Sequence, residues 1–150
     1  MFYIIDPSEL DFRFAGMPLQ RRRDRLGELV RARGAHWGSL RVRGTDFMAA
    51  VEELDHFLGA GEELLNSAFE NSPNEMLPIG SSDRYNPLFG YYPPHLVRRF
   101  DRELRTIPEA VIQHWEEGPN GDTIGSVTYA FRSAFTEAAK RRQAIAVEHR

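Results

Sequence analysis

The sequence predicts an α+β fold: a single, mostly helical domain with a small sheet built from strands near its two ends. β-Prone runs lie at residues 2–5 and 144–147, close to opposite ends of the chain. Between them, apolar residues recur at helical spacing, most clearly over residues 94–104. The chain has 150 residues, of which 41% are hydrophobic, and no repeat or linker divides it. We therefore expect one domain over residues 1–150.

The first half of the chain alternates strand and helix signals. Asp6 can cap a short turn through residue 10, and Pro18 can open a helix over 19–33 that Gly34 ends. Leucine and valine alternate with arginine over 40–43, which predicts a strand that pairs with the terminal ones. A helix capped by Thr45 follows and ends at Gly59. Its expected core face comprises Phe47, Val51, Leu54, Phe57 and Leu58.

The second half begins with an irregular stretch, residues 70–92, that is rich in proline, glycine and aromatic residues. Pro93 and Pro94 then suit the first turn of a helix, because proline has no N–H to leave unsatisfied there. Another helix is expected over residues 126–142, followed by the strand at 144–147. The sequence predicts helix and sheet in one α+β unit.

The composition excludes several classes of site. The chain has no cysteine, which excludes thiolate nucleophiles, disulfides and zinc sites with sulfur ligands. The beginning of the sequence lacks the pattern of a signal peptide, and no uncharged run is long enough to span a bilayer. We expect a cytoplasmic protein that does not associate with membranes.

The charge is unevenly distributed along the chain. Residues 1–44 hold nine arginines and five acidic residues, a balance of +4, whereas residues 45–94 hold nine acidic residues and one arginine, a balance of −8. An acidic segment disfavours nucleic acid, because phosphates bind lysine and arginine clusters, and it suits a basic protein partner. The alternative is an ordinary solvated helix face.

Known catalytic and metal-binding patterns do not occur in the sequence. The histidines (His36, His56, His95, His114 and His149) lack the spacing that places two ligands on one helix face. Adjacent glutamates such as Glu52 and Glu53 point in different directions on a helix, and no nucleophile-elbow or phosphate-loop motif is present. We therefore predict no catalytic residue, no metal and no cofactor.

A set of short segments recurs in a known pattern: residues 56–61 (HFLGAG), 77–80 (LPIG), 90–97 (GYYPPHLV), 127–135 and 138–147. Through them, residues 45–148 resemble the YfbM-like family, which has no established enzymatic activity. The sequence departs from the family at Arg141 and Arg142, where the family has a glycine turn, and in a shorter connection over 106–125. The resemblance implies an α+β fold and a bacterial cytosolic protein, and it assigns no functional residue.

An aromatic segment is the strongest candidate for a binding site. Aromatic rings next to polar side chains are typical of interaction hot spots. The alternative is that the same rings fix a long loop to the core. The predicted protein-binding residues are Glu62, Glu63, Asp83, Arg84, Tyr85, Phe89, Tyr91 and Tyr92.

Three hypotheses for function follow. The first is a non-enzymatic immunity-type protein that neutralises a basic partner toxin by occluding it. The second is an enzyme or small-molecule sensor with a pocket near residues 71–95, holding Tyr85, Tyr92 or His95. The third is a homo-oligomer joined through an edge strand at 144–148.

Overall fold

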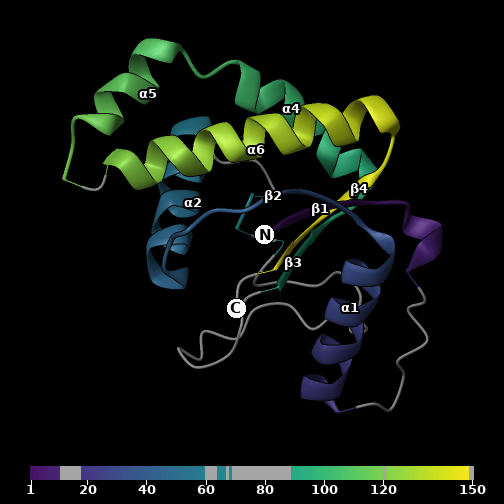
Figure 1. Cartoon of the computed structure of the whole chain (residues 1–150). Coiled ribbons are helices and arrows are strands. Elements are labelled where there is room, and N and C mark those ends of the chain that lie inside the picture. Colours follow the sequence, from purple (N-terminus) through teal and green to yellow (C-terminus); the bar gives the residue numbers. More distant parts are fainter. Residues whose placement is uncertain (11–17, 60–63, 67, 69–88, 120, 149–150) are drawn as a thin grey trace.

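Two strands from opposite ends of the sequence form the centre of the sheet. In the computed structural model, β1 (Phe2–Ile5) pairs antiparallel with β4 (Ala144–Glu148). β2 (Ala35–Gly38) pairs with β1 and β3 (Phe89–Tyr92) pairs with β4, so the order is β2-β1-β4-β3 (Figure 1). The predicted α+β fold, with terminal strands that pair with each other, is confirmed.

The structure describes residues 1–10, 18–59, 64–66, 68, 89–119 and 121–148. No helix in these ranges is both long and apolar enough to cross a membrane. The helices are η1 (Pro7–Glu9), α1 (Leu19–Arg33), α2 (Gly44–Leu58), α4 (Pro94–Arg105), α5 (Glu109–Glu116) and α6 (Gly121–Arg141).

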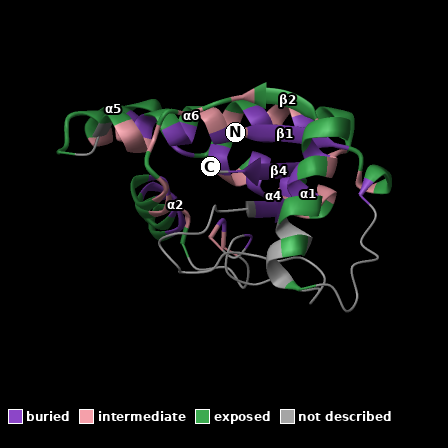
Figure 2. Ribbon diagram, turned by 60° about the horizontal axis from the view of Figure 1, so that its bottom comes forward, coloured by how far each residue is buried: buried purple, intermediate pink, exposed green. Residues whose placement is uncertain are grey.

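The two faces of the sheet belong to separate hydrophobic cores. Phe2 and Ile4 point into the larger core, whereas Tyr3 and Ile5 point into the smaller one, because successive side chains of a strand alternate between faces. α2, α4, α5 and α6 cover the larger core, and α1 covers the smaller one (Figures 1 and 2). Both faces are buried, which explains why the terminal strands are continuous apolar runs.

The α4 helix begins where the sequence predicts it. Pro93 is the N-cap and Pro94 the first helical residue, and the buried side chains of the helix are spaced as one face requires. The other predicted boundaries at Asp6, Gly34 and Gly59 are also confirmed. The Asp6 carboxylate accepts a hydrogen bond of 2.9 Å from the Ser8 backbone N–H.

The predicted strand over residues 40–43 is wrong, since β2 lies five residues earlier. Leu40 and Val42 are in an irregular segment that passes beside Phe2 and Phe47 at the edge of the larger core. Alternating contacts along this segment produce the same sequence pattern as a strand. β2 is an edge strand with mainly exposed side chains, so it has no apolar alternation to reveal it.

Four further expectations need correction. Residues 89–92 form β3 rather than irregular structure, and α6 begins at residue 121 rather than 126. α2 begins at Gly44 after the N-cap Arg43, which provides no side-chain hydrogen bond, so Thr45 is not the cap. β4 is not an edge strand, because β1 and β3 flank it on both sides. An oligomer joined through β4 would therefore require one of these strands to separate.

Arg132 of α6 stabilises the corner between α4 and α5. Its guanidinium group donates hydrogen bonds to the carbonyl oxygens of Leu104, at 3.0 Å, and Ile107, and it forms an ion pair of 3.3 Å with Glu109. The planar group thus binds two carbonyls at the end of α4, where regular helical hydrogen bonding stops.

We expect Arg132→Ala to lower the free energy of unfolding by about 2 kcal/mol, because hydrogen bonds to a charged group are lost at a partly buried corner. Urea denaturation measures this change. Arg132→Lys is the matched control: it keeps the charge but not the fork geometry, and it should recover less than half of the loss. Full recovery by lysine would contradict the role of the fork.

Candidate functional site

Only part of the predicted binding segment can be examined. The backbone of Phe89 belongs to β3, but its side chain is outside the described part of the structure. Tyr91 and Tyr92 are described in full. The predicted residues that lie outside the described ranges are Glu62, Glu63, Asp83, Arg84 and Tyr85.

Tyr91 and Tyr92 are core residues. Tyr92 is fully buried, its hydroxyl donates a 2.7 Å hydrogen bond to the Leu65 carbonyl oxygen, and its ring packs against Phe100 and Phe135. Burial raises the pKa of the Tyr92 hydroxyl well above its ordinary value and raises the pKa of Tyr91 to about 12. Both rings are buried and cannot contact a partner. Their positions agree with the alternative interpretation, in which the aromatic residues fix the segment to the core.

Of the residues expected to line a small-molecule pocket near residues 71–95, the structure describes Tyr92 and His95. Tyr92 is surrounded by the rings of the larger core, which fill the space around it. His95 lies on the exposed side of the first turn of α4. Tyr85 is outside the described residues.

Asp55 closes the turn that follows α2. Its carboxylate accepts hydrogen bonds from the backbone N–H groups of Leu65, at 2.6 Å, and Asn66, at 2.8 Å. Burial raises the pKa of the Asp55 carboxyl, and the two backbone hydrogen bonds oppose this rise. Since Tyr92 bonds the carbonyl of the same Leu65, the three residues fix the chain after α2 to the sheet. This arrangement is structural rather than catalytic.

The exposed ring of Phe57 on α2 contacts the partly buried ring of Trp115 on α5. Phe57 is 42% exposed although it is a large apolar side chain, and its ring meets that of Trp115 edge-on with centroids 5.4 Å apart. Both α2 and α5 lie on the side of the sheet opposite α1 (Figure 1). The sequence predicted Phe57 to be a core residue. That prediction is wrong, because Leu58 turns toward the core at the helix end and Phe57 cannot share its direction.

Exposed carboxylates lie close in sequence to this aromatic pair, and the side chain of Glu116 lies beside Gly125 of α6. Glu53 precedes Phe57 by one helical turn, Glu52 is its neighbour, and Glu116 and Glu117 follow Trp115; all four are exposed. Within the described ranges, none of the four has a basic side chain within ion-pair distance. We call these six residues the acidic aromatic surface: Glu52, Glu53, Phe57, Trp115, Glu116 and Glu117.

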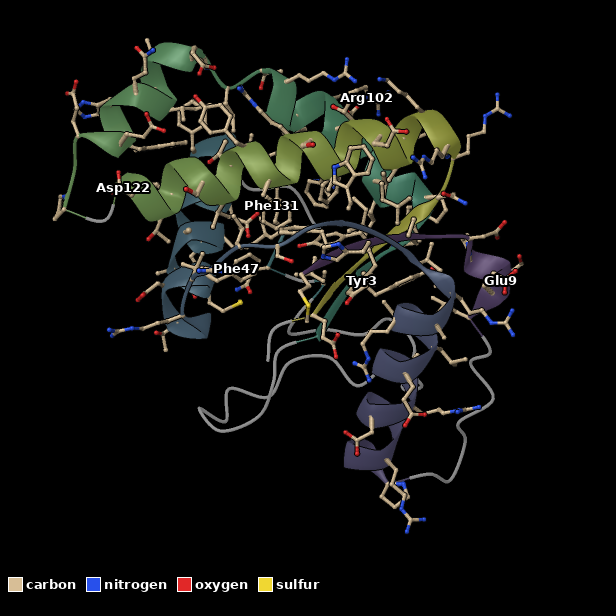
Figure 3. All side chains as sticks on the ribbon, viewed as in Figure 1. Tyr3, Glu9, Phe47, Arg102, Asp122 and Phe131 are labelled. Carbon is tan, nitrogen blue, oxygen red and sulfur yellow. The ribbon has the colours of Figure 1, made fainter. Side chains whose placement is uncertain are left out.

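A groove of about 230 Å³ lies beside this surface, between the end of α2 and the end of α4. Phe57 and Leu58 line it from α2, and α4 contributes Arg102 and Glu103. The Glu103 carboxylate is already paired with Arg99, at 2.8 Å. Figure 3 shows Arg102 on α4, on the outer side of the helical layer.

The described histidines and carboxylates are dispersed over the structure. No three His, Cys, Asp or Glu side chains in the described ranges are arranged to hold a metal ion. His36, His56, His95 and His114 are each exposed, and His149 lies outside these ranges.

The comparisons with known proteins identify no relative. No family model matches the chain, and no curated protein or solved structure is significantly similar to it. The fold and the surface define the class, a small α+β protein with an exposed acidic and aromatic patch. The similarity to the YfbM-like family stays a prediction from sequence.

Proposed function

We propose that the protein is a non-enzymatic binding protein that docks a basic protein partner on its acidic aromatic surface. The observation that carries the proposal is the exposed ring of Phe57, one helical turn after Glu53, whose carboxylate has no basic side chain within ion-pair distance among the described residues. A bound partner would bury the exposed aromatic ring and would supply basic side chains to pair with the carboxylates. Both interactions form only in a complex.

The two parts of the surface have different physical roles. Aromatic rings supply contact area that loses little conformational freedom on binding, so they are frequent among the residues that dominate affinity. Exposed carboxylates act at longer range and raise the association rate with a basic partner, in a way that depends on salt.

The most concrete form of the proposal is an immunity-type protein that neutralises a partner toxin by occluding it. The acidic segment of the sequence supports a basic partner, and the fold places part of that segment, α2, beside Trp115. We place the contact on α2 and α5 rather than on Tyr91 and Tyr92, since these two rings are buried.

Reversing the charge of Glu52 and Glu53 tests this proposal. The tagged chain is used to capture its partner from the source organism at low salt, and native mass spectrometry gives the stoichiometry. Stopped-flow association is then measured with the purified pair. We expect Glu52→Lys with Glu53→Lys to slow association by at least about tenfold at low salt, and by less at high salt.

The matched control carries the same change of net charge on the opposite side of the sheet. Glu9→Lys with Glu28→Lys breaks two exposed ion pairs, with Arg33 and Arg25, which contribute little to stability. It should leave the association rate within about twofold. Equal slowing in both double variants would show an effect of net charge only and would reject this surface. A partner that is not basic would reject the proposal as well.

A further inference from the structure

The groove between α2 and α4 adjoins the acidic aromatic surface through Phe57, which belongs to both. Its α2 wall is apolar, formed by Phe57 and Leu58. Its α4 wall carries Arg102 and Thr106 one turn apart. A partner that covers the surface would therefore also cover the mouth of this groove.

The charges that line the groove are opposite in sign and adjacent in sequence. Arg102 would repel a cation, and Glu103 would repel an anion. Arg99 already neutralises Glu103, whereas Arg102 has no ion-pair partner in the described ranges, so a cation is disfavoured in the groove itself. The contact that gains most is an apolar side chain laid against Phe57 and Leu58.

On the α2 side of the groove, by contrast, a cation is favoured. Glu53 lies one helical turn before Phe57, and Glu52 is next to it, with neither carboxylate neutralised by a described basic side chain. Positive residues that flank an apolar anchor would meet these carboxylates. The complementary contact segment of a partner therefore has an apolar centre and basic flanks.

We propose that the groove is the anchor site of the partner and receives one large apolar side chain, preferably aromatic, flanked by basic residues. The inference rests on the proposed function and adds the chemistry of the partner's contact segment. Phe57 and Leu58 bury the anchor, and Glu52 and Glu53 pair with its basic neighbours. Buried aromatic anchors surrounded by polar rims are the usual form of an interaction hot spot.

Short peptides test this inference without the natural partner. Three are used: one phenylalanine between arginines, the same peptide with alanine in place of phenylalanine, and phenylalanine between glutamates. The protein carries Trp37→Phe, so that Trp115, which touches Phe57, is the one remaining tryptophan. Titration of its fluorescence reports binding at the groove, because none of the peptides contains tryptophan.

We expect the phenylalanine–arginine peptide to bind at least about tenfold more tightly than either of the other two. Phe57→Ala in the same background should abolish the preference for phenylalanine over alanine. Tyr129→Ala, which removes a comparably exposed ring outside the groove, should preserve it. Circular dichroism of both variants confirms that the fold is retained.

The other outcomes separate this inference from the proposed function. Equal binding of the two arginine peptides, lost on Glu52→Lys with Glu53→Lys, would overturn the anchor site and leave the acidic surface standing. Tighter binding of the glutamate peptide would overturn both. Binding of none of the three peptides would overturn the anchor site, and the partner experiment described above would still decide the proposed function.

Discussion

Replacing Phe131 by alanine is expected to lower the free energy of unfolding by about 4 kcal/mol. Phe131 is fully buried in the middle of α6, and its ring lies 5.4 Å from that of Phe2 and 5.9 Å from that of Phe47, between centroids. Truncation removes these contacts and leaves a cavity bordered by helix and sheet, which cannot collapse to fill it. Urea denaturation measures the change.

Phe57→Ala is the matched control, because it makes the same chemical change at a site that is 42% exposed. It should cost about 1 kcal/mol, since much of that ring is already in water. If Phe131→Ala does not fold, Phe131→Leu gives a smaller cavity and an intermediate loss. Similar costs at the two sites would contradict the central position of Phe131.

Asp55→Ala is expected to lower the free energy of unfolding by about 3 kcal/mol. The replacement leaves the N–H groups of Leu65 and Asn66 without their carboxylate acceptor, and an unsatisfied buried donor loses its full solvation. Glu52→Ala, on an exposed side of the same helix, should change stability by less than about 0.5 kcal/mol. Equal effects of the two replacements would show that the carboxylate of Asp55 does not hold this turn.

The pH dependence of the Asp55→Ala effect has a definite sign. Burial raises the pKa of the Asp55 carboxyl above its ordinary 3.8, so the folded protein holds this proton more tightly than the unfolded chain. The contribution of Asp55 to stability therefore falls as the pH rises from 3.8 through the folded-state pKa. Denaturation of both proteins should show a larger loss on replacement below pH 3.8 than at neutral pH. A loss that increases with pH would contradict the raised pKa.

The parts of the fold predicted from sequence are those in which local chemistry and burial agree. Three such features each predict a single local structure. They are the apolar runs of β1 and β4, the double proline before α4 and the glycine after α2. β2 could not be predicted, because an exposed edge strand needs only backbone pairing and leaves no pattern in its side chains.

The candidate site illustrates the same limit. Whether an aromatic residue is buried or exposed depends on which neighbour occupies the core, and local periodicity does not settle this at a helix end. Leu58 takes the inward direction, so Phe57 is exposed. Tyr92 is buried because α6 places Phe131 and Phe135 around it, more than 35 residues further along the chain. Contacts between segments that are distant in sequence therefore decide which aromatic rings are exposed.

The pairing of β1 with β4 sets the order in which the protein can assemble. During synthesis residues 2–5 are made well before residues 144–148, so β1 cannot pair with its inner neighbour until the intervening residues have been made. β3 pairs with β4, and α1 packs on a core that β4 helps to form. The final packing of β3 and α1 therefore also requires β4. The apolar residues of β1 thus stay unpaired until β4 has been made. Contacts that span such long sequence separations also form slowly. Correct folding therefore depends on completing the sheet before those residues pair with another strand.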